Sequence, residues 1–360
     1  MSTRPRITFD ERGFCNACQW MEEKQKLNWP EREKYLKKIL NETKKNKKGN
    51  YDCIVPCSGG KDGSYVAYQL RDKYEMNVLT VTVRPPLELD VGEKNLKNFT
   101  KTKDNFEHLH ITTNNKSMQK INKLGFIEKG SPYYGWIVTV FTSIIRTALA
   151  HKIDLVFYGE DGEIEYGGST QNKNNPIFDF KYIVKNYFEG DHQKICKKSG
   201  LSKNELHHFT LDEKEFKKNN LKLTHWGYYE PWDPYRNYLF VKEKYTFQET
   251  ETANVGTFTN FAQNDQSIFA LHTYLMYLKF GFGRATQDAG IEIRRGAMTR
   301  EQGKNLVNLY DNQYPDKFES LYLDYYQMTK DEFQNVLDNH ANKDLFEKKN
   351  GRWSPKFKIS

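Results

Sequence analysis

The sequence has few cysteines and no long hydrophobic run. Its 360 residues include five cysteines, at positions 15, 18, 53, 57 and 196, and so odd and sparse a set argues against a disulfide framework and fits a reducing compartment. The longest apolar stretch lies within Trp136–Ala150 and is interrupted by threonine, serine and arginine. It falls short of the about 18–20 residues of a membrane span. Because Met1–Asp10 also lacks an apolar signal region, we expect a cytoplasmic protein without a membrane span.

The charge balance excludes little. The net charge is +8, which permits an anionic partner such as a nucleotide, a phosphorylated sugar or RNA but requires none. Lys44–Lys48, the densest basic run, is either a solvated helix end or a contact surface. With 37% hydrophobic and 14% aromatic residues, the chain has enough apolar material for a core, which excludes disorder as its main state.

Strand and helix patterns alternate along the first half of the chain, after a helix at Glu31–Leu40. The alternation predicts a parallel sheet with helices on both faces, whose ligands bind beyond the carboxyl ends of the strands. The predicted strands are Asp52–Cys57, Val78–Val83, His108–Thr112 and Asp154–Tyr158. The predicted helices between them are Ser64–Tyr74, Asn95–Lys101, Lys116–Leu124 and Pro132–His151.

The remaining segments are less regular. We expect residues 1–28 to be irregular, 159–264 to be mixed and polar, and 265–340 to be mainly helical. The predicted C-terminal helices are Ile268–Phe280, Thr299–Tyr310 and Thr329–Asn339, and the basic tail after Asp344 could fray. The sequence thus divides into an N-terminal segment with a CxxC and a helix (1–48), an α/β core (49–170) and a mostly helical region for substrate or partner (171–360).

A glycine-rich loop between a predicted strand and a predicted helix carries the sharpest chemical signal. Glycines let backbone N–H groups approach an anion, and the start of the next helix adds positive potential for phosphate. Hydroxyl groups and a lysine add further donors, and the spacing of a Walker A loop is absent. The alternative is a turn that only packs. The loop consists of Ser58, Gly59, Gly60, Lys61, Asp62, Gly63 and Ser64.

This loop resembles the SGGxDS loop of the PP-loop ATP pyrophosphatases. The resemblance implies binding of ATP and its cleavage to AMP and pyrophosphate. The sequence departs from the pattern at Gly63, where many members have serine, with Ser64 one place later.

An acidic loop follows the fourth predicted strand, in Gly159–Gly168. Carboxylates at the carboxyl end of a strand would face the nucleotide and could hold the Mg²⁺ that accompanies ATP. The alternative is an acidic surface turn. Together with the glycine-rich loop, this loop provides the candidate catalytic residues Lys61, Asp62, Glu160, Asp161 and Glu165.

A third region combines glycines, rings and charges between two predicted helices. Aromatic rings can stack on a substrate, and arginine can form forked bonds to phosphate or carboxylate. The alternatives are a simple helix linker and, for the histidine on the preceding helix, a structural role. The candidate substrate residues are His272, Lys279, Arg284, Asp288 and Arg294.

Several separated blocks resemble the N-acetyl sugar amidotransferases of bacterial O-antigen and lipopolysaccharide biosynthesis, the WbpG type. The blocks are TRPRITFDERGFCNAC (3–18), YDCIVPCSGGKDGSY (51–65), YGEDGEIEYGG (158–168), GTFTNF (256–261) and LHTYLMYLKFGFGRATQDAGIEIRRGAMTRE (271–301). The resemblance implies a PP-loop α/β fold of the adenine nucleotide alpha hydrolase (HUP) type. It also implies that ATP adenylates the oxygen of an N-acetyl group on a nucleotide-activated sugar, after which ammonia displaces AMP to give an acetamidino group.

The resemblance further implies a partner, a HisH-like glutaminase subunit of the imidazole-glycerol-phosphate-synthase type that supplies ammonia. The sequence agrees, because it offers no credible glutaminase nucleophile. Cys57 lies beside the glycine-rich loop, and no histidine is placed to pair with Cys196.

Cys15 and Cys18 have the spacing of half a tetrahedral zinc site. No second CxxC exists in the sequence, so two free cysteines are the alternative to bound Zn²⁺. Members of the resembled family often carry another CxxC just upstream of the Thr-Arg-Pro segment. We therefore expect Met1 to correspond to an internal methionine of longer relatives, or half of a zinc knuckle to have been lost.

Two other functions remain open. A PP-loop enzyme that thiolates or amidates tRNA would share the loop and its AMP chemistry. It would also need an RNA-binding region, and since no such signature is visible we expect no nucleic-acid partner. A non-catalytic protein with a vestigial nucleotide loop would bind ATP without turnover.

Overall fold

The computed structural model describes residues 2–102, 106–190, 192–217 and 220–359. Within these residues, six strands form one sheet in the order β3–β2–β1–β4–β6–β5, parallel except for the edge strand β5. The strands are β1 (Cys53–Pro56), β2 (Val78–Val83), β3 (Glu107–Ile111), β4 (Leu155–Tyr158), β5 (Ile177–Phe178) and β6 (Lys222–His225). The predicted α/β fold with a mostly parallel sheet is confirmed, and it is consistent with the PP-loop architecture.

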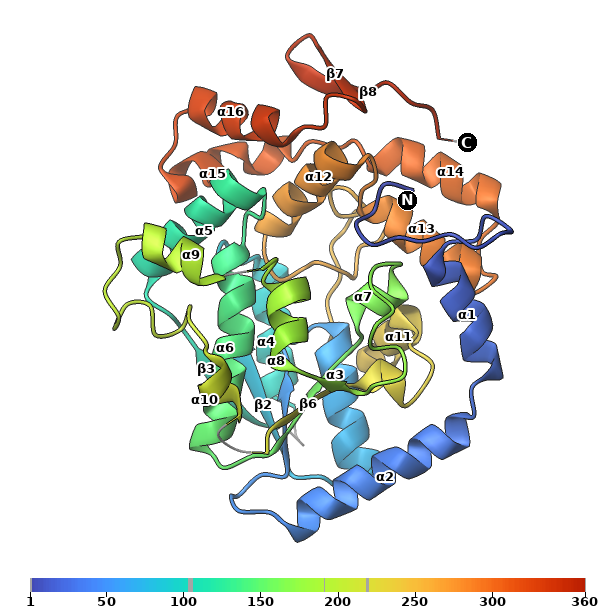
Figure 1. Ribbon diagram of the computed structural model, residues 1–360, viewed down its shortest axis with the longest axis vertical. Helices are drawn as coiled ribbons and strands as arrows, with labels where there is room; N and C mark the ends of the chain where they lie inside the picture. The colour runs from blue at the N-terminus through green and yellow to red at the C-terminus, as the bar shows by residue number, and fades with distance from the viewer. Residues whose placement is uncertain (1, 103–105, 191, 218–219, 360) are drawn as a thin grey trace.

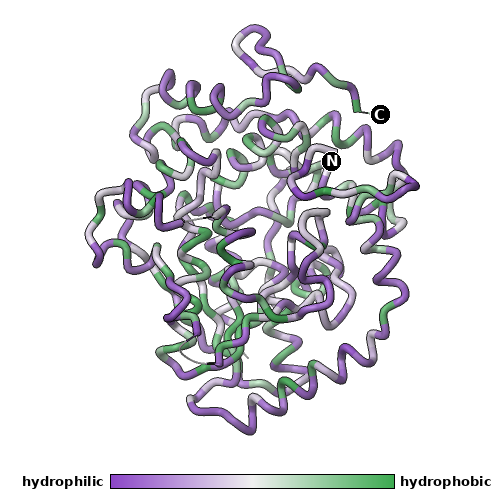
Figure 2. The backbone as a smooth tube through the Cα atoms, viewed as in Figure 1, coloured by the Kyte–Doolittle hydropathy of each residue, from purple (hydrophilic) through white to green (hydrophobic). Residues whose placement is uncertain are grey.

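Alternate residues of the buried strands face opposite sides of the sheet, as the pleat requires. In β1, Cys53 and Val55 belong to one core cluster and Ile54 to the other. Figure 2 shows the hydrophobic segments gathered in the sheet and the long central helix, while α2 (Trp29–Lys45) at the bottom is largely hydrophilic. Both faces of the sheet are therefore covered, as expected for parallel strands.

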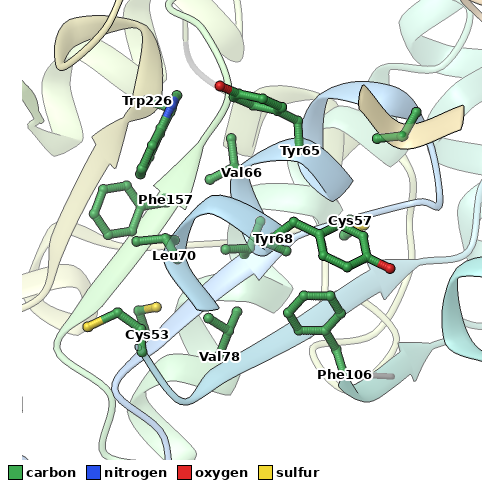
Figure 3. Packing of buried hydrophobic residues seen from close by; sticks show 14 of the residues in the cluster. Cys53, Cys57, Tyr65, Val66, Tyr68, Leu70, Val78, Phe106, Phe157 and Trp226 are labelled. Atoms are coloured by element: carbon green, nitrogen blue, oxygen red, sulfur yellow. The ribbon is translucent and has the colours of Figure 1, made fainter. Parts of the chain in front are cut away.

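The helices of the first half cover these two faces. α2 and α3 share a cluster with β1, and α5 and α6 pack on the opposite side. Figure 3 shows Val66 of α3 and Leu70 just after it beside buried side chains of the sheet, with Tyr65 on the side of α3 away from the strands. The helices are α1 (Asn16–Lys26), α2 (Trp29–Lys45), α3 (Lys61–Tyr68) continued by a π turn (Gln69–Lys73), α4 (Asp90–Thr100), α5 (Asn115–Lys129) and α6 (Tyr134–Ala150).

Helix α1 corrects the expectation that residues 1–28 are irregular. Its buried face consists of Asn16, Ala17, Trp20 and Lys24. Two polar residues on that face hide the apolar period from the sequence. By contrast, the helix predicted at Glu31–Leu40 is present within α2, and the Asn28 side chain caps its start by accepting a hydrogen bond from the N–H of Glu31 at 3.1 Å.

The sheet continues past residue 170, so the boundary predicted there falls inside the sheet. β6 pairs with β4 through four residues, and Leu223 and Thr224 are fully buried. Its four residues, KLTH, are too short and too polar to be recognised as a strand. The helices of this region are α7 (Gly162–Glu165), α8 (Phe180–Tyr182) continued by a π turn (Ile183–Tyr187), α9 (His192–Lys198), α10 (Glu213–Lys217), a 3₁₀ turn (Trp226–Tyr228) and α11 (Pro234–Lys244).

The C-terminal region is helical, as predicted, and lies at the top of Figure 1 with the sheet below it. Its tail does not fray: Phe346 and Trp353 are buried in a hairpin. The elements are α12 (Ile268–Phe280), α13 (Arg284–Arg294), α14 (Arg300–Tyr310), a 3₁₀ turn (Asp316–Phe318), α15 (Glu319–Tyr326), α16 (Lys330–His340), β7 (Phe346–Lys349) and β8 (Arg352–Pro355). Among the described residues, no helix combines the length and the hydropathy needed to cross a bilayer.

His225, at the end of β6, makes the fold sensitive to acid. It is 4% exposed and stacks on Phe178, and burial lowers its pKa from 6.5 to about 3. Below pH 6.5 the ring of His225 is protonated in the unfolded chain but stays neutral in the folded protein. The free energy of unfolding therefore falls as the pH drops toward 3. At pH 5 this loss amounts to about 2 kcal/mol. We expect His225→Phe to shrink the difference in unfolding free energy between pH 7 and pH 5 by about that amount, as measured by urea denaturation.

His207→Phe, the same change at an exposed position, is the matched control. An unchanged pH difference in the His225 variant would contradict a buried neutral ring at this position.

Candidate functional site

The glycine-rich loop lies between β1 and α3, at the carboxyl end of the sheet. Gly59 has φ +76°, and a Cβ there would lie 2.4 Å from the Cα of Leu96 in α4, so only glycine fits. The loop residues Ser58 and Gly60 to Gly63 line a pocket of about 130 Å³. The facing residues 261–265 come from the segment before α12. This pocket brings the loop's donors and the start of α3 to one place, as phosphate binding needs.

Asp62 and Lys61 form the charged end of this pocket. The Lys61 ammonium contacts the Asp62 carboxylate, and the Asn237 side chain donates to the other oxygen of Asp62 at 3.0 Å. Lys61 is buried although it carries a charge. The two side chains are therefore held in fixed positions at the first turn of α3.

Ser64 lies outside the lining of the pocket. Its hydroxyl is fully buried, 3.3 Å from the Cys57 sulfur and 3.0 Å from the hydroxyl of Tyr245. The close packing of the chain also explains why glycine stands at position 63. A Cβ there would lie 2.5 Å from the carbonyl oxygen of Pro56, which leaves no room for serine. The departure from the SGGxDS pattern thus goes with a helix packed directly on the end of β1.

A larger cavity of about 890 Å³ adjoins the pocket, and both are lined by Lys61, Asp62 and residues 261–263 and 265. Its walls come from distant segments: the N-terminus, the loop after β4, the start of α6, the turn after α8, and helices α12 and α13. Of the sequence-predicted site residues, the structure brings to this cavity Lys61, Asp62, Glu160, His272, Lys279, Arg284 and Asp288.

Glu160 faces the cavity. Burial, followed by the negative charge of Asp62, raises its pKa to about 7. The hydroxyl of Tyr166 donates to it at 3.1 Å. The negative charge of Asp62 thus opposes the ionisation of Glu160, and a bound cation would offset this effect.

Asp161 and Glu165 lie outside the cavity lining. Asp161 is 1% exposed and accepts hydrogen bonds from Tyr182 at 2.8 Å and Tyr187 at 3.3 Å. Glu165 accepts from the Trp20 indole at 2.9 Å and pairs with Lys24 at 2.6 Å. Both carboxylates join the loop to neighbouring segments.

Arg284 is directed toward the acidic loop from the start of α13. It pairs with Asp288 at 2.8 Å, and Asp288 in turn accepts from the Thr257 hydroxyl at 2.6 Å. Burial opposes its charge, but Asp288, Tyr166 and Glu160 more than offset this and raise the pKa of the guanidinium. Arg284 is therefore a fixed cation in the cavity wall.

The remaining substrate candidates have different surroundings. Burial, with the charges of Lys279 and Arg284, lowers the pKa of His272 to about 3, so its ring is neutral at pH 7. The Lys279 ammonium donates to the carbonyl of Lys129 at 2.9 Å. Arg294 lies outside the cavity lining and donates to the carbonyl of Glu165 at 3.3 Å.

Cys15 and Cys18 lie at the start of α1 with their sulfurs 3.6 Å apart. The hydrogen bond with Cys18 lowers the pKa of the Cys15 thiol, and the same bond raises that of Cys18. Across the part of the chain that the structure describes, no group of three or more His, Cys, Asp or Glu side chains could hold a metal ion. The zinc prediction therefore has two ligands here and stays a prediction.

Three residues of the site escaped the sequence analysis. Asp265 lines both the pocket and the cavity, and it bonds to Ser58 of the loop. Arg4 and Arg6 line the cavity from the N-terminus. The two arginines lie in one of the blocks that resemble the family, and Asp265 lies just after another. Position in or next to such a block was therefore the signal that could have found them.

Part of the chain matches a known protein family. Residues 255–358 match the family model described as LPS biosynthesis protein WbpG-like, C-terminal domain. The match supports a WbpG-type lipopolysaccharide biosynthesis protein, and the matched residues include Lys279, Arg284 and Asp288 of the cavity wall. A search among curated proteins gave no match.

The two acids Glu165 and Glu160 should respond oppositely to neutralisation. In Glu165→Gln the nearly buried Lys24 loses its counter-charge, so we expect the free energy of unfolding to fall by about 3 kcal/mol. In Glu160→Gln a carboxyl whose ionisation is already unfavourable becomes neutral, so stability at pH 8 should stay level or rise. Urea denaturation without divalent cations measures both. An unchanged free energy of unfolding in Glu165→Gln would contradict the assignment of Glu165 as a link between α7 and α1.

Proposed function

We propose that this WbpG-type chain is an ATP-dependent amidotransferase that converts an N-acetyl group of a nucleotide-activated sugar into an acetamidino group. One observation carries the proposal. The pocket lined by the glycine-rich loop shares Lys61 and Asp62 with a larger cavity, and residues of the matched segment 255–358 line both. ATP phosphates at the loop and a sugar in the cavity would meet at these two residues.

The proposed reaction has two steps. The amide oxygen of the acetamido group attacks the α-phosphorus of ATP, and the bond to pyrophosphate breaks. Ammonia then attacks the activated amide carbon, and the carbon–oxygen bond to AMP breaks. An amide carbon is a poor electrophile and AMP is a good leaving group, so the protein contributes mainly position and charge.

The described residues fit this division of work. Lys61 and the N–H groups at the start of α3 oppose the negative charge of the departing pyrophosphate. Arg284 supplies a fixed positive charge on the cavity side. The rings of Phe261, Phe280 and Phe282 line the same cavity and would keep water from the activated amide.

The donor set also fits Mg²⁺, which would shield the phosphate charges. Magnesium in nucleotide sites is held by one or two carboxylates together with substrate phosphates. Asp62 and Glu160 provide two. Burial and the charge of Asp62 raise the pKa of Glu160, and a cation between the two carboxylates would oppose both effects.

Ammonia would come from a separate glutaminase subunit. Two buried cysteines agree with this assignment. Burial raises the pKa of Cys57 to about 11, and Cys196 is buried with its thiol bonded to the carbonyl of Phe209 at 3.3 Å. Neither has the ionisable, accessible thiol that a glutaminase nucleophile requires.

The test is mass spectrometry of a reaction with ATP, Mg²⁺, ammonium and a UDP-linked diacetamido sugar, with AMP and pyrophosphate measured in parallel. We expect a product lighter by the difference between an oxygen and an NH group, with one AMP per turnover. Asp62→Asn should slow AMP formation at least about a hundredfold, because it removes charge at the phosphates. Asp331→Asn, at an exposed position of α16, is the matched control.

Two outcomes would contradict the proposal. AMP formation that requires tRNA would favour a PP-loop tRNA-modifying enzyme. ATP binding without turnover, even with ammonium and sugar present, would favour a non-catalytic nucleotide-binding protein.

A further inference from the structure

The N-terminal arm, residues 2–10, forms part of the cavity wall. Arg4, Pro5 and Arg6 line the cavity together with residues of α12 and α13. The Thr3 hydroxyl contacts the carbonyl of Phe280 at the end of α12. The arm is thus attached to both the C-terminal region and, through Arg6, the acidic loop.

Arg6 and Glu163 form a complete pair. The guanidinium of Arg6 donates two parallel hydrogen bonds to Glu163, at 2.7 and 2.8 Å. The N–H of Ser169 donates to the same carboxylate at 2.8 Å. This forked geometry is the strong form of an arginine–carboxylate bond. The carboxylate of Glu163 is therefore already bonded to Arg6 and to the backbone.

Arg4 is left without such a partner. Its nearest acid is the same Glu163, with the closest nitrogen and oxygen 3.8 Å apart, and no hydrogen bond of its guanidinium occurs among the residues that the structure describes. Its side chain is only 13% exposed, against 40% for Arg6. Burial lowers the pKa of Arg4, opposed by the charge of Glu163. Because Arg4 lines the cavity and its guanidinium has no hydrogen-bond partner among the described residues, its N–H groups are available to an anion in the cavity.

We propose that Arg4 binds an anionic group, phosphate or carboxylate, of the sugar substrate and thereby fixes which sugars the cavity accepts. This proposal rests on the proposed function in one respect, namely that the cavity binds the sugar.

The position of Arg4 separates this group from the phosphates of ATP. The pocket at the glycine-rich loop is lined by residues of that loop, α4 and the segment 261–265, and by none of the arm. The charged neighbours of Arg4 are Glu163, Arg6 and Arg294, none of which lines that pocket. Arg4 therefore serves the end of the cavity near α7 and α13.

The experiment measures binding to the full chain by isothermal titration calorimetry. The probes are UDP-N-acetylglucosamine for a phosphate, N-acetylneuraminic acid for a carboxylate and N-acetylglucosamine as the neutral sugar. We expect one anionic probe to bind more tightly than the neutral sugar, and Arg4→Gln to weaken that probe by about tenfold to a hundredfold. Arg4→Lys, which keeps the charge but loses the fork, should lose less. The probe affected identifies the anion.

Arg12→Gln is the matched control, because Arg12 lies close by in sequence, is exposed and pairs with Asp10 and Glu22 outside the cavity. ATP binding is measured separately for every variant and should not change. Failure of the parent to bind ATP would remove the proposed function without deciding the role of Arg4. Equal affinity of the parent and Arg4→Gln for both anionic probes, or no binding of either probe by the parent at millimolar concentration, would overturn the proposal. So would a parallel loss of ATP binding.

Discussion

The burial of carboxylates in the loop after β4 is the constraint on which the rest of the structure depends. An acid removed from water must be paired or hydrogen-bonded, and each acid here is served by a different part of the chain. Glu163 is held by the N-terminal arm, Glu165 by α1, and Asp161 by tyrosines of α8 and the turn after it. The loop is fixed from three sides as a result, and Glu160 is the acid left facing the cavity.

The C-terminal region solves a similar problem at the start of α13. Asp311, at the end of α14, accepts hydrogen bonds from the N–H groups of Gly283 at 2.8 Å and Thr286 at 3.1 Å. A carboxylate at a helix N-terminus satisfies free N–H groups and opposes the helix dipole. A Cβ at Gly283 would lie 2.7 Å from that carboxylate, so the glycine permits the close approach. The direction of Arg284 into the cavity follows from this joint.

Much of the fold could be predicted because its information is local. The buried strands β1, β2 and β4 are recognised by short apolar runs, and the amphipathic helices by the spacing of their apolar residues. The loop at 58–64 is recognised by its glycines. The rest depends on partners far along the chain. Helix α1 was missed because Lys24 faces inward, which only Glu165 explains. For the same reason Asp161 and Glu165 could not be told apart from Glu160: the three acids look alike in sequence, and their tyrosine, tryptophan and lysine partners lie 21, 145 and 141 positions away.

The cavity also has a consequence for how the protein is made. The contact of Thr3 with Phe280 spans 277 positions, and that of Arg6 with Glu163 spans 157. During translation the first strands and the glycine-rich loop emerge early, and units that pair locally can form while the ribosome is still working. The opposite wall exists only after α12 and α13 have been synthesised. A nascent chain therefore gains its glycine-rich loop long before it gains an enclosed cavity beside it.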